Sequence, residues 1–585
     1  MEKPDSLESI QSEEQDWLAN VYQGDKLPEL TGKVYIVGAL LSVLLIATNI
    51  YVGLKTGLTQ SGSILAALLG FAILRLFNTK STVLENNNIQ TMASAAGSIG
   101  IMVSAIPALI LLGYNFSALQ LFIWIILINI LGVLFAVPLR KQFVVIEKLP
   151  FPSGTACAEA IKAMYAHGAD AAKKAKSLLL TSFLSGVVTW FRDGVPAIIP
   201  AITNLPLTIG QYALQPIRLG LNWSPMLVGV GFLVGARIGV SLLLGAIIGW
   251  MVLGPILADA HVIEGFTMRQ IRNWNMWAAI ALMVSAGFTA FALKGGTALR
   301  AFRSMTRARL EGSSRIEFSF SLWLGCVVLS AIAISIVMQT MFQIPIWMTL
   351  LAVVVAYLFS ILAVRAYGET DMNPVGAMGY ATQMIYGAVA PGNMMTCVTT
   401  AGITASGANQ SADMMQDFKT GYLLGATPRR QTYAQLAGAA VGSIVAVPIF
   451  FALTGAYGIG TDNMPAPSAV SWSGMAQLFS KGFAALPPYT LFGIIGGLIV
   501  GILLTFFEKS KLRRFVPSPY GLGIAMILPA DFSIMIFLGA MVKLLLDKKF
   551  PRWMEDYSIS LASGLIVGES IIGVVISVLA VMGLF

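Results

Sequence analysis

The chain has 585 residues, of which 56% are hydrophobic and 11% are charged, and its mean hydropathy is +0.78. Soluble proteins carry about 25% charged residues, which cover their surface. This chain is therefore excluded from that class, and its composition predicts an all-α polytopic membrane protein whose apolar surface faces lipid. The net charge of +9 arises from short basic runs between apolar stretches, which indicates membrane-protein loops rather than a nucleic-acid partner.

The chain begins with a polar tail, residues 1–30, which is acidic through Gln23. It lacks a basic region followed by an apolar core, so we do not expect a cleavable signal peptide. We expect this tail to be cytoplasmic.

Thirteen apolar segments come close to the ~20 residues that a spanning helix needs. They are 33–54, 58–77, 89–112, 118–138, 178–201, 226–250, 275–293, 318–341, 345–366, 431–456, 489–507, 521–546 and 558–584. Three further stretches, 205–222, 374–390 and 392–407, are apolar but short or interrupted, and we expect spans, half-helices or re-entrant segments there. The sequence thus predicts about 16 transmembrane or re-entrant helices.

A basic linker, 294–317, divides the chain into two transmembrane halves, 31–293 and 318–585. Basic loops favour the cytoplasmic side. Another basic run begins at Arg140, in the first half, and four apolar segments precede it. Because an even number of spans returns the chain to the same side, the N-terminus is also expected in the cytoplasm. We expect a multi-pass protein of the inner cell membrane.

Two later regions bear on the orientation. Residues 457–488 carry few charges and are expected to form an external loop. Lys548, Lys549 and Arg552 lie one apparent span beyond the basic run that ends at Arg514. Either 521–546 is a re-entrant pair, or the loop that follows it is external and basic.

The two halves repeat short motifs in the same order, which suggests an internal duplication. The pairs are Asn49–Gly57 with Arg365–Thr370, Glu85–Thr91 with Ala408–Asp413, and Leu149–Gly154 with Val516–Gly521. Their common placement beside basic loops favours two halves of the same orientation.

The chain resembles the oligopeptide transporter (OPT) family, which includes peptide transporters and the yellow-stripe-like metal-chelate transporters. The matching blocks are Asn49–Gly57, Glu85–Ile99, Leu149–Ala158, Gly235–Trp250, Gly368–Gly379, Gly402–Arg430 and Ser563–Gly573. The resemblance implies a secondary transporter of about 16 spans, built from a duplicated half. It also implies proton-driven uptake of small peptides or peptide-like chelates.

A polar stretch from Tyr367 to Arg430 interrupts the apolar second half. Pro374 disfavours the α region at Asn373, so a helix break is expected there, and such a break at membrane depth lines a cavity or is buried in protein. Glu369 and Asp371 lie just before it, and each is a candidate for binding a proton or a peptide ammonium group. Alternatively, they cap a helix and form a salt bridge to Arg365.

Asp413 and Asp417 are four residues apart and share a helix face. Repulsion between two such charges favours retention of a proton. They are therefore candidates for a coupling carboxylate and a substrate anchor. Alternatively, they belong to a cytoplasmic helix cap, because Lys419 and Arg429-Arg430 follow closely.

A run of amides supplies both donors and acceptors for a peptide backbone. Asn87 and Gln90 belong to it and follow the candidate carboxylate Glu85, and Asn409 and Gln410 are the counterparts in the second half. Alternatively, the first run is a loop with an Asx cap that leads into a helix at Ile89.

The remaining candidates are isolated polar residues in apolar surroundings. Arg237 is expected to pair with a carboxylate or to bind a peptide C-terminus. Lys55 is a candidate for a ligand contact or an ion pair. Glu569, which has no obvious local partner, is a functional-site hypothesis by default. Tyr51 and Tyr367 are cavity-lining candidates, although aromatic residues more often serve packing or interface anchoring.

Other chemistry has little support in the sequence. Three cysteines (Cys157, Cys326, Cys397) without a CxxC spacing and two histidines (His167, His261) predict no disulfide framework, no metal centre and no cofactor. There is no Walker A motif. We expect a proton-coupled peptide transporter, with a metal-chelate carrier as the alternative and a channel or intramembrane enzyme as weaker ones. A homo-oligomer is left open.

Overall fold

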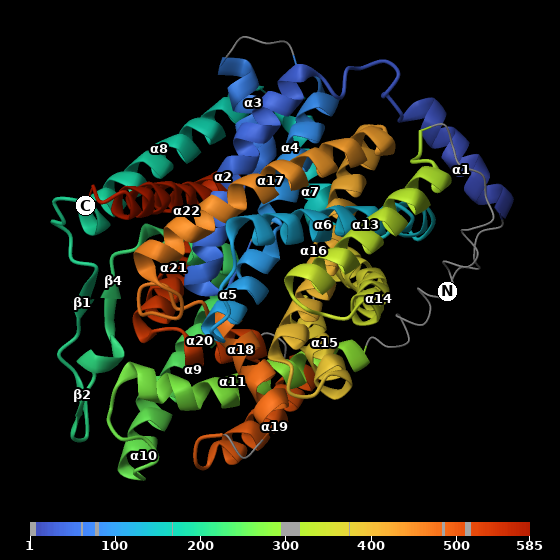
Figure 1. Ribbon diagram of the computed structural model, residues 1–585. Helices are drawn as coiled ribbons and strands as arrows, with labels where there is room; N and C mark the ends of the chain where they lie inside the picture. The colour runs from blue at the N-terminus through green and yellow to red at the C-terminus, as the bar shows by residue number, and fades with distance from the viewer. Residues whose placement is uncertain are drawn as a thin grey trace.

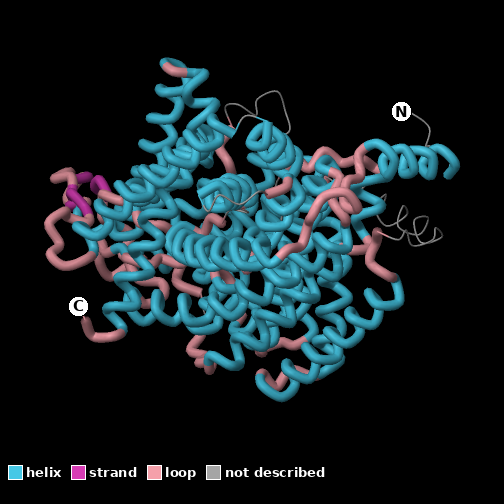
Figure 2. Tube along the Cα trace, turned by 90° about the horizontal axis from the view of Figure 1, so that it is seen from above, coloured by secondary structure: helices cyan, strands magenta, loops and turns pink. Residues whose placement is uncertain are grey.

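The computed structural model describes residues 7–59, 62–76, 81–166, 168–293, 316–371, 373, 375–482, 486–508 and 516–584. These residues are almost entirely helical, which confirms the predicted all-α polytopic class (Figure 1, Figure 2). The basic segments at 294–315 and 509–515, His167 and Pro374 lie outside the described residues.

The elements follow one another in chain order. Those before the basic linker are α1 (Leu7–Asn20), α2 (Gly32–Thr56), α3 (Ser63–Leu76), α4 (Val83–Gly97), η1 (Gly100–Met102), α5 (Ala105–Leu111), α6 (Ala118–Ala136), η2 (Lys141–Ile146), α7 (Pro152–Ala166), α8 (Gly168–Asp193), β1 (Ile202–Asn204), β2 (Thr208–Ile209), β3 (Tyr212–Ala213), η3 (Gln215–Ile217), β4 (Gly220–Asn222), α9 (Pro225–Ala246), η4 (Ile247–Leu253), α10 (Gly254–Asp259) and α11 (Met268–Ala292). Those after it are α13 (Phe320–Met341), α14 (Ile346–Thr370), α15 (Val375–Val389), α16 (Met394–Leu424), α17 (Pro428–Tyr457), α18 (Pro467–Lys481), α19 (Thr490–Glu508), α20 (Pro519–Ile527), α21 (Ala530–Lys549) and α22 (Pro551–Val581).

Nine helices of the described residues are long and apolar enough to cross a membrane. They cover Gly32–Thr56, Val83–Leu111, Ala118–Ala136, Pro225–Asp259, Phe320–Met341, Ile346–Glu369, Pro428–Tyr457, Thr490–Glu508 and Pro551–Val581. Several other expected spans coincide with helices that are shorter, broken or more polar, such as α3, α16 and the pair α20 and α21.

Local sequence signals set many of the helix ends. The hydroxyl of Thr82 accepts a hydrogen bond from the Glu85 amide, and the Glu85 carboxylate accepts one from the Thr82 amide, which forms a capping box at α4. The helix therefore begins at Val83, so the suggested Asx-capped start at Ile89 is wrong. At the other end of α2, Gly57 adopts a left-handed conformation with φ 74° that glycine accepts without strain.

The stretch 205–222 is not a span or a half-helix. It contains the short strands β2, β3 and β4, and β1 pairs with β4 while β2 pairs with β3, both antiparallel. These hairpins form one edge of the molecule in Figure 1. Gly210 lies at the β2–β3 turn with φ 57°, so turn chemistry outweighed the apolar composition here.

The segment 457–488, expected as an external loop, contains the helix α18. Trp472 on this helix is buried, and α18 packs against α5, α11, α15 and α16. An apolar inner face, not visible as a long hydrophobic run, therefore folds the segment back into the protein. The side of the membrane on which it lies stays a prediction.

The long helix α16 lies at the centre of the fold. Of its 31 residues, 26 are buried, although the helix is rich in polar residues. It packs against α4, α6, α7, α14, α15 and α17, among others (Figure 1). Polar side chains that face neighbouring helices, rather than lipid, explain why so polar a segment is stable at this depth.

Two helices near the starts of the predicted halves have similar geometry. Both α2 and α14 contain 25 residues, and each ends at a residue in the left-handed region, Gly57 and Asp371. α2 packs against α4, and α14 packs against α16. The internal duplication itself stays a prediction.

Candidate transport site

A cavity of about 1150 Å³ is lined by residues from both predicted halves. The first half contributes the α2–α3 connection, the end of α4, and parts of α9 and α11, and the second half contributes parts of α14, α15, α16, α18, α19 and α20. Small-molecule sites usually occupy about 300–1,000 Å³. The cavity is therefore large enough for a ligand of a few amino-acid units.

Several helices end at the wall of this cavity. Gly57, Ser98 and Asp371 follow the last residues of α2, α4 and α14, while Pro467 and Pro519 begin α18 and α20. Helix ends leave N–H and C=O groups without intrahelical partners and carry partial charges. The wall thus offers backbone groups to a polar ligand, as expected of discontinuous helices in transporters.

The helix break predicted at Asn373 is present, because α14 ends at Thr370 and α15 begins at Val375. Asp371 adopts a left-handed conformation with φ 58°, which aspartate tolerates better than most residues. Its amide donates to the Tyr367 carbonyl group. The break thereby places Asp371 and Asn373 at the cavity.

Among the described residues, the charged side chains at the cavity wall are four carboxylates and one guanidinium group. They are Glu369, Asp371, Asp413, Glu508 and Arg365. With all of them ionised, the acids would outnumber the base by three charges, so the cavity is an acidic environment.

Two of these carboxylates are neutralised by arginine. Arg365 Nε lies 3.1 Å from Glu369 Oε1, and its Nη1 lies 2.9 Å from Glu147 Oε2. Arg237 Nη2 lies 2.8 Å from Glu508 Oε1 and holds it from outside the cavity lining. The salt bridge between Glu369 and Arg365, considered above as the alternative to a binding role, is therefore present. Arg237 pairs with a carboxylate, as expected.

Asp371 is held by neutral groups. Its carboxylate accepts hydrogen bonds from the Ser153 amide at 3.2 Å, from Ser153 Oγ at 2.5 Å and from Gln416 Nε2 at 2.6 Å. Within the described residues it has no ion-pair partner. These donors orient an ionised carboxylate at the cavity but leave its charge uncompensated.

Asp413 and Asp417 lie well inside α16, so the suggested cytoplasmic cap is wrong. Asp413 is 3% exposed and lines the cavity, whereas Asp417 is 0% exposed and lies one turn further along the helix. Asp417 accepts hydrogen bonds from Gln90 Nε2 and from Ser94 Oγ, the latter at 2.6 Å. No basic side chain in the described ranges forms an ion pair with either aspartate.

The partners of Asp417 belong to a polar stripe on α4. Asn87, Gln90, Thr91, Ser94 and Ser98 recur at helical spacing and face the same side of the helix. This stripe is buried except at its end, where Ser98 reaches the cavity. Neither amide atom of Asn87 has a hydrogen-bond partner among the residues that the structure describes.

The asparagines at the cavity hydrogen-bond to each other. Asn373 Nδ2 donates to Asn409 Oδ1 at 3.0 Å, and Asn409 Nδ2 donates to the Ser98 carbonyl group at 2.7 Å. Gln410, the next residue, is fully buried away from the cavity and donates to the Ala95 carbonyl group at 2.9 Å. Of this predicted pair, only Asn409 faces the cavity.

A second buried cluster gathers three of the other candidates outside the cavity lining. Arg192 Nη2 lies 3.0 Å from Glu569 Oε1, and Lys55 Nζ lies 3.6 Å from the same atom. Lys55 also donates to Tyr51 Oη at 2.7 Å. Glu569 accepts further hydrogen bonds from Ser224 Oγ and from the backbone amide of Met226. The partners that the sequence did not reveal for Glu569 thus come from α2, α8 and the start of α9.

Glu85 is likewise outside the cavity. In addition to its role in the capping box, it accepts a hydrogen bond from Thr31 at 2.7 Å and pairs with Lys33 at 3.2 Å. Tyr367, by contrast, lines the cavity. The structure therefore divides the predicted site residues between the cavity, the α4–α16 contact and the Glu569 cluster.

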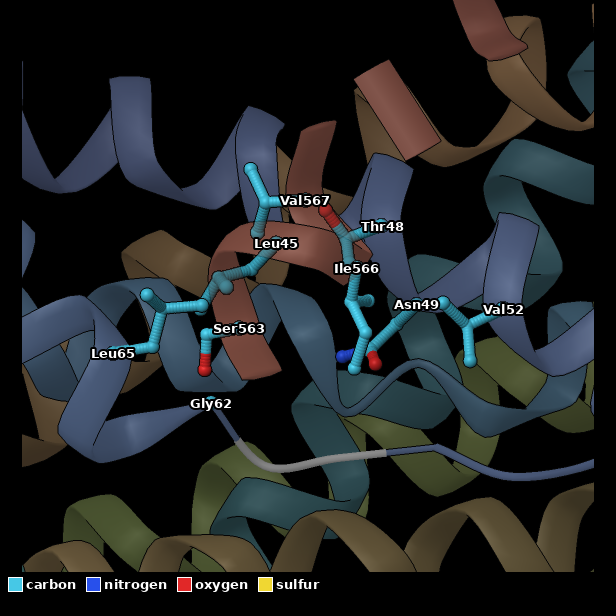
Figure 3. Close-up of a pocket in the computed structure, with 9 residues that line it drawn as sticks. All are labelled: Leu45, Thr48, Asn49, Val52, Gly62, Leu65, Ser563, Ile566 and Val567. Carbon is cyan, nitrogen blue, oxygen red and sulfur yellow. The ribbon is translucent and has the colours of Figure 1, made fainter. Parts of the chain in front are cut away.

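A second, much smaller hollow lies between α2, α3 and α22 (Figure 3). Its volume is about 10 Å³, and apolar side chains such as Leu45, Val52 and Ile566 form most of its wall. That is room for about one water molecule. The larger cavity is therefore the candidate ligand site.

Sequence reasoning did not single out some cavity and core residues. Gln435 lies between Asp413 and Asp417, and Gln431 donates to Thr91 Oγ1 at 3.1 Å. Both glutamines interrupt the apolar helix α17 four residues apart, and this was the available signal. Ser153 and Gln416, which hold Asp371, gave no comparable signal, because their importance depends on packing between α7, α14 and α16.

A polytopic, almost entirely helical membrane protein with a large cavity that several helix ends and charged side chains line is typical of membrane transport proteins. A family model described as "OPT oligopeptide transporter protein" matches residues 29–580. The chain therefore belongs to the OPT family, a family of transporters, and the resemblance noted in the sequence is confirmed.

Several curated relatives cover nearly the whole chain. "Putative oligopeptide transporter YGL114W" of Saccharomyces cerevisiae is 27% identical over 94% of this chain and 96% of its own. "Probable metal-nicotianamine transporter YSL14" of Oryza sativa subsp. japonica is 28% identical over 93% and 84%. "Putative oligopeptide transporter" of Haemophilus influenzae is 28% identical over 90% and 92%.

Proposed function

We propose that the protein is a secondary active transporter that takes up small oligopeptides together with protons by alternating access. The observation that carries the proposal is the pair Asp371 and Asp413, two cavity carboxylates without a basic partner among the described residues. An ionised carboxylate binds the ammonium group of a peptide. Protonation of such a carboxylate removes one negative charge from the cavity.

Coupling requires that the driving ion bind the outward-facing and inward-facing states with different affinity. Of the carboxylates considered from the sequence, Glu369 is bound by Arg365, and Glu569 is bound by Arg192 and Lys55. A carboxylate held by a cation is poorly suited to take up a proton, because the cation favours its ionised form. Asp371 and Asp413 therefore remain the better candidates.

The alternative cargo is a metal chelate. It is supported by the relatives that are named as metal-nicotianamine transporters. In the described part of the chain, no group of three or more His, Cys, Asp and Glu residues is placed to hold a metal ion. The chelator would then supply the metal ligands, and the cavity would bind the chelator through its charged groups.

The test is accumulation of cargo in proteoliposomes with an imposed proton gradient, with peptides and metal chelates offered side by side. We expect peptides to accumulate against their gradient and to carry protons with them. Accumulation of chelates alone would replace peptide with chelate as the cargo. Flux of both without accumulation would contradict a secondary active transporter and favour a channel.

The placement in the cell is part of the same proposal. We place the protein in the inner cell membrane with its N-terminus and basic linker in the cytoplasm. The two predicted halves, 31–293 and 318–585, would then rock against each other around the shared cavity. Cysteine labelling of residue 2 in intact and permeabilised cells tests the orientation, and sedimentation in detergent tests for a homo-oligomer.

A further inference from the structure

The contact between α4, α16 and α17 encloses Asp413 and Asp417 without a compensating cation from the part of the chain that the structure describes. Burial of an ionised carboxylate is costly unless it is paired, and two such charges one helical turn apart also repel each other. The site is therefore most stable when it holds one positive charge, such as a proton. A second observation points the same way, because Asp413 Oδ1 is buried at the cavity wall and no described residue forms a hydrogen bond with it.

The two carboxylates differ in their partners. Asp417 accepts hydrogen bonds from the Gln90 amide and the Ser94 hydroxyl group, an arrangement suited to an ionised carboxylate, which only accepts. Asp413 lies near the hydroxyl groups of Ser94 and Ser98, and within the described residues the amide of Gln435 lies 3.4 Å from its Oδ2, at the outer limit of hydrogen-bond distance. Asp413 is thus the acid that fits the protonated form.

Gln435 connects the two acids. One end of its amide lies beside Asp413 Oδ2, and the other end lies 3.1 Å from both Asp417 Oδ2 and the Thr91 carbonyl oxygen. When the nitrogen faces Asp417, it donates to both acceptors, and the amide oxygen faces Asp413. Only a protonated Asp413 can donate to that oxygen, so the orientation of this amide is linked to the protonation of Asp413.

The ionisable groups on the surrounding helices are engaged elsewhere. On α7, the Cys157 thiol contacts Gln90 Oε1 at 3.7 Å, and on α14, Arg365 pairs with Glu147 and Glu369. Three other ionisable groups lie on or next to these helices. Glu85 on α4 pairs with Lys33, and Asp371 after α14 accepts a hydrogen bond from Gln416. Arg430 on α17 contacts the Gly24 carbonyl group and Glu29. On α16 itself, Lys419 is 9% exposed and forms no ion pair with either aspartate within the described residues. Asp417, Gln435 and the nearby serine hydroxyl groups therefore dominate the electrostatic environment of Asp413.

We propose that Asp413 carries the transported proton, that Asp417 is its partner acid, held by Gln90 and Ser94, and that Gln435 turns its amide when Asp413 gains or loses that proton. The proposal rests on the proposed function and assigns the coupling step to one carboxyl group. The proton enters from the cavity, which Asp413 lines, and leaves Asp413 ionised when it is released. Gln435 is in this view a positioning residue, because it touches the acid and not the cargo.

The test compares proton-driven accumulation with cargo exchange in proteoliposomes. Asp413→Asn is expected to lower cargo-dependent proton influx and accumulation at least tenfold while exchange of cargo across the membrane changes less than twofold. Asp413→Glu is expected to restore part of the accumulation. The matched control is Asp547→Asn, an aspartate on α21 that pairs with Lys543 away from the cavity and should behave as wild type.

A spectroscopic readout tests the role of Gln435. The infrared difference between low and high pH should contain the C=O band of a protonated carboxylic acid, which Asp413→Asn removes and Asp371→Asn retains. Gln435→Leu should shift this band and the pH profile of accumulation, because the hydrogen bond to the amide oxygen is lost. A band that is unchanged in Gln435→Leu would overturn the role assigned to this residue.

The outcomes separate this inference from the proposed function. If the wild-type protein shows no proton-driven accumulation, the proposed function fails. If the wild-type protein accumulates cargo and Asp413→Asn does so equally well, the assignment of Asp413 is overturned while proton coupling stands. Accumulation driven by a sodium gradient at constant pH would show that the site binds a metal cation in place of the proton.

Discussion

Two clusters of buried acids lie in the same protein and have different kinds of partner. Glu569 is 0% exposed and is bound by Arg192, Lys55 and Ser224, with no part in the cavity wall. Asp413 and Asp417 are equally buried, yet amides and hydroxyl groups are their partners, and Asp413 reaches the cavity. Burial alone therefore does not separate the two clusters, whereas the charge of the partners and access to the cavity do.

The two clusters also connect different parts of the fold. The Glu569 cluster joins α2, α8, α22 and the start of α9. Its ion pairs and hydrogen bonds thus hold four helices together. The aspartate pair lies where α4, α16 and α17 meet, next to the helix ends that line the cavity. We expect the first cluster to stabilise the fold and the second to change its charge during transport.

The largest expected effect follows from removal of the Glu569 charge. Glu569→Gln leaves Lys55 buried without its ion-pair partner, while Arg192 keeps Asp193, and breaking a buried ion pair costs about 3–5 kcal/mol. We expect a corresponding loss of stability in chemical unfolding of the detergent-solubilised protein. The control is Asp413→Asn, which deprives no basic side chain of a partner and should cost about 1 kcal/mol or less. Equal losses in the two variants would contradict the division between the clusters.

The next effect comes from the helix contact that supports the aspartate pair. A Cβ atom at Gly438 would overlap with the Met92 carbonyl oxygen, where α17 crosses α4. Gly438→Ala should push the helices apart, lower stability by about 1–3 kcal/mol and displace Gln435, one turn away. We expect reduced proton-driven accumulation, measured in proteoliposomes beside unfolding.

Two other glycines serve as controls for this variant. Gly325→Ala on α13, where an added Cβ meets open space, should leave stability unchanged or slightly higher. Gly568→Ala would overlap with the Ser182 carbonyl oxygen beside the Glu569 cluster. It should therefore destabilise the protein without the specific loss of coupling expected for Gly438→Ala.

A smaller effect is expected at the cavity carboxylate that faces the cargo. Asp371→Asn removes a charge that no described basic group compensates, while Ser153 and Gln416 still hold the side chain. We expect the KM for a peptide with a free ammonium group to rise about tenfold, equivalent to about 1.4 kcal/mol. Glu508→Gln, whose charge Arg237 already neutralises, should change KM less. Equal shifts of KM in the two variants would contradict the idea that Arg237 keeps Glu508 from interacting with the peptide.

The smallest effect concerns the segment that precedes α2. Glu29 is 2% exposed and accepts hydrogen bonds from the Thr427 amide at 3.1 Å and from Thr427 Oγ1 at 2.8 Å, with Arg430 nearby at 3.6 Å. Burial raises the pKa of this carboxyl group. The docked segment binds the proton more strongly than the undocked one, so docking should weaken as pH rises above the ordinary carboxyl range.

Hydrogen exchange of peptides that cover residues 17–30 measures this effect. Wild-type protection should fall relative to Glu29→Gln as pH rises, since the variant cannot ionise. Comparison of the two proteins at each pH removes the intrinsic pH dependence of exchange. A constant ratio across the range would contradict a role for the buried carboxyl group.

The sequence determined the class of protein and much of its helical framework. Few charges and long apolar runs specify membrane helices, because lipid offers no hydrogen-bond partners and each segment must satisfy its own backbone. The break between α14 and α15 was also predictable, since Pro374 acts on its immediate neighbour. The same local reasoning failed at 205–222, where the hydrophobic content was high but turns divided the segment into strands.

Only the tertiary structure decided which acids are neutralised and which face the cavity. Glu569 finds Arg192 and Lys55, which are hundreds of residues away in the chain. Asp417 likewise meets Gln90 across a helix contact, and Gln435 reaches both aspartates from a third helix. Periodicity shows which face of a helix carries a charge, but the partner depends on how the helices pack. The sequence thus determines a helical membrane protein with buried acids, and packing determines which of them remains without a cation.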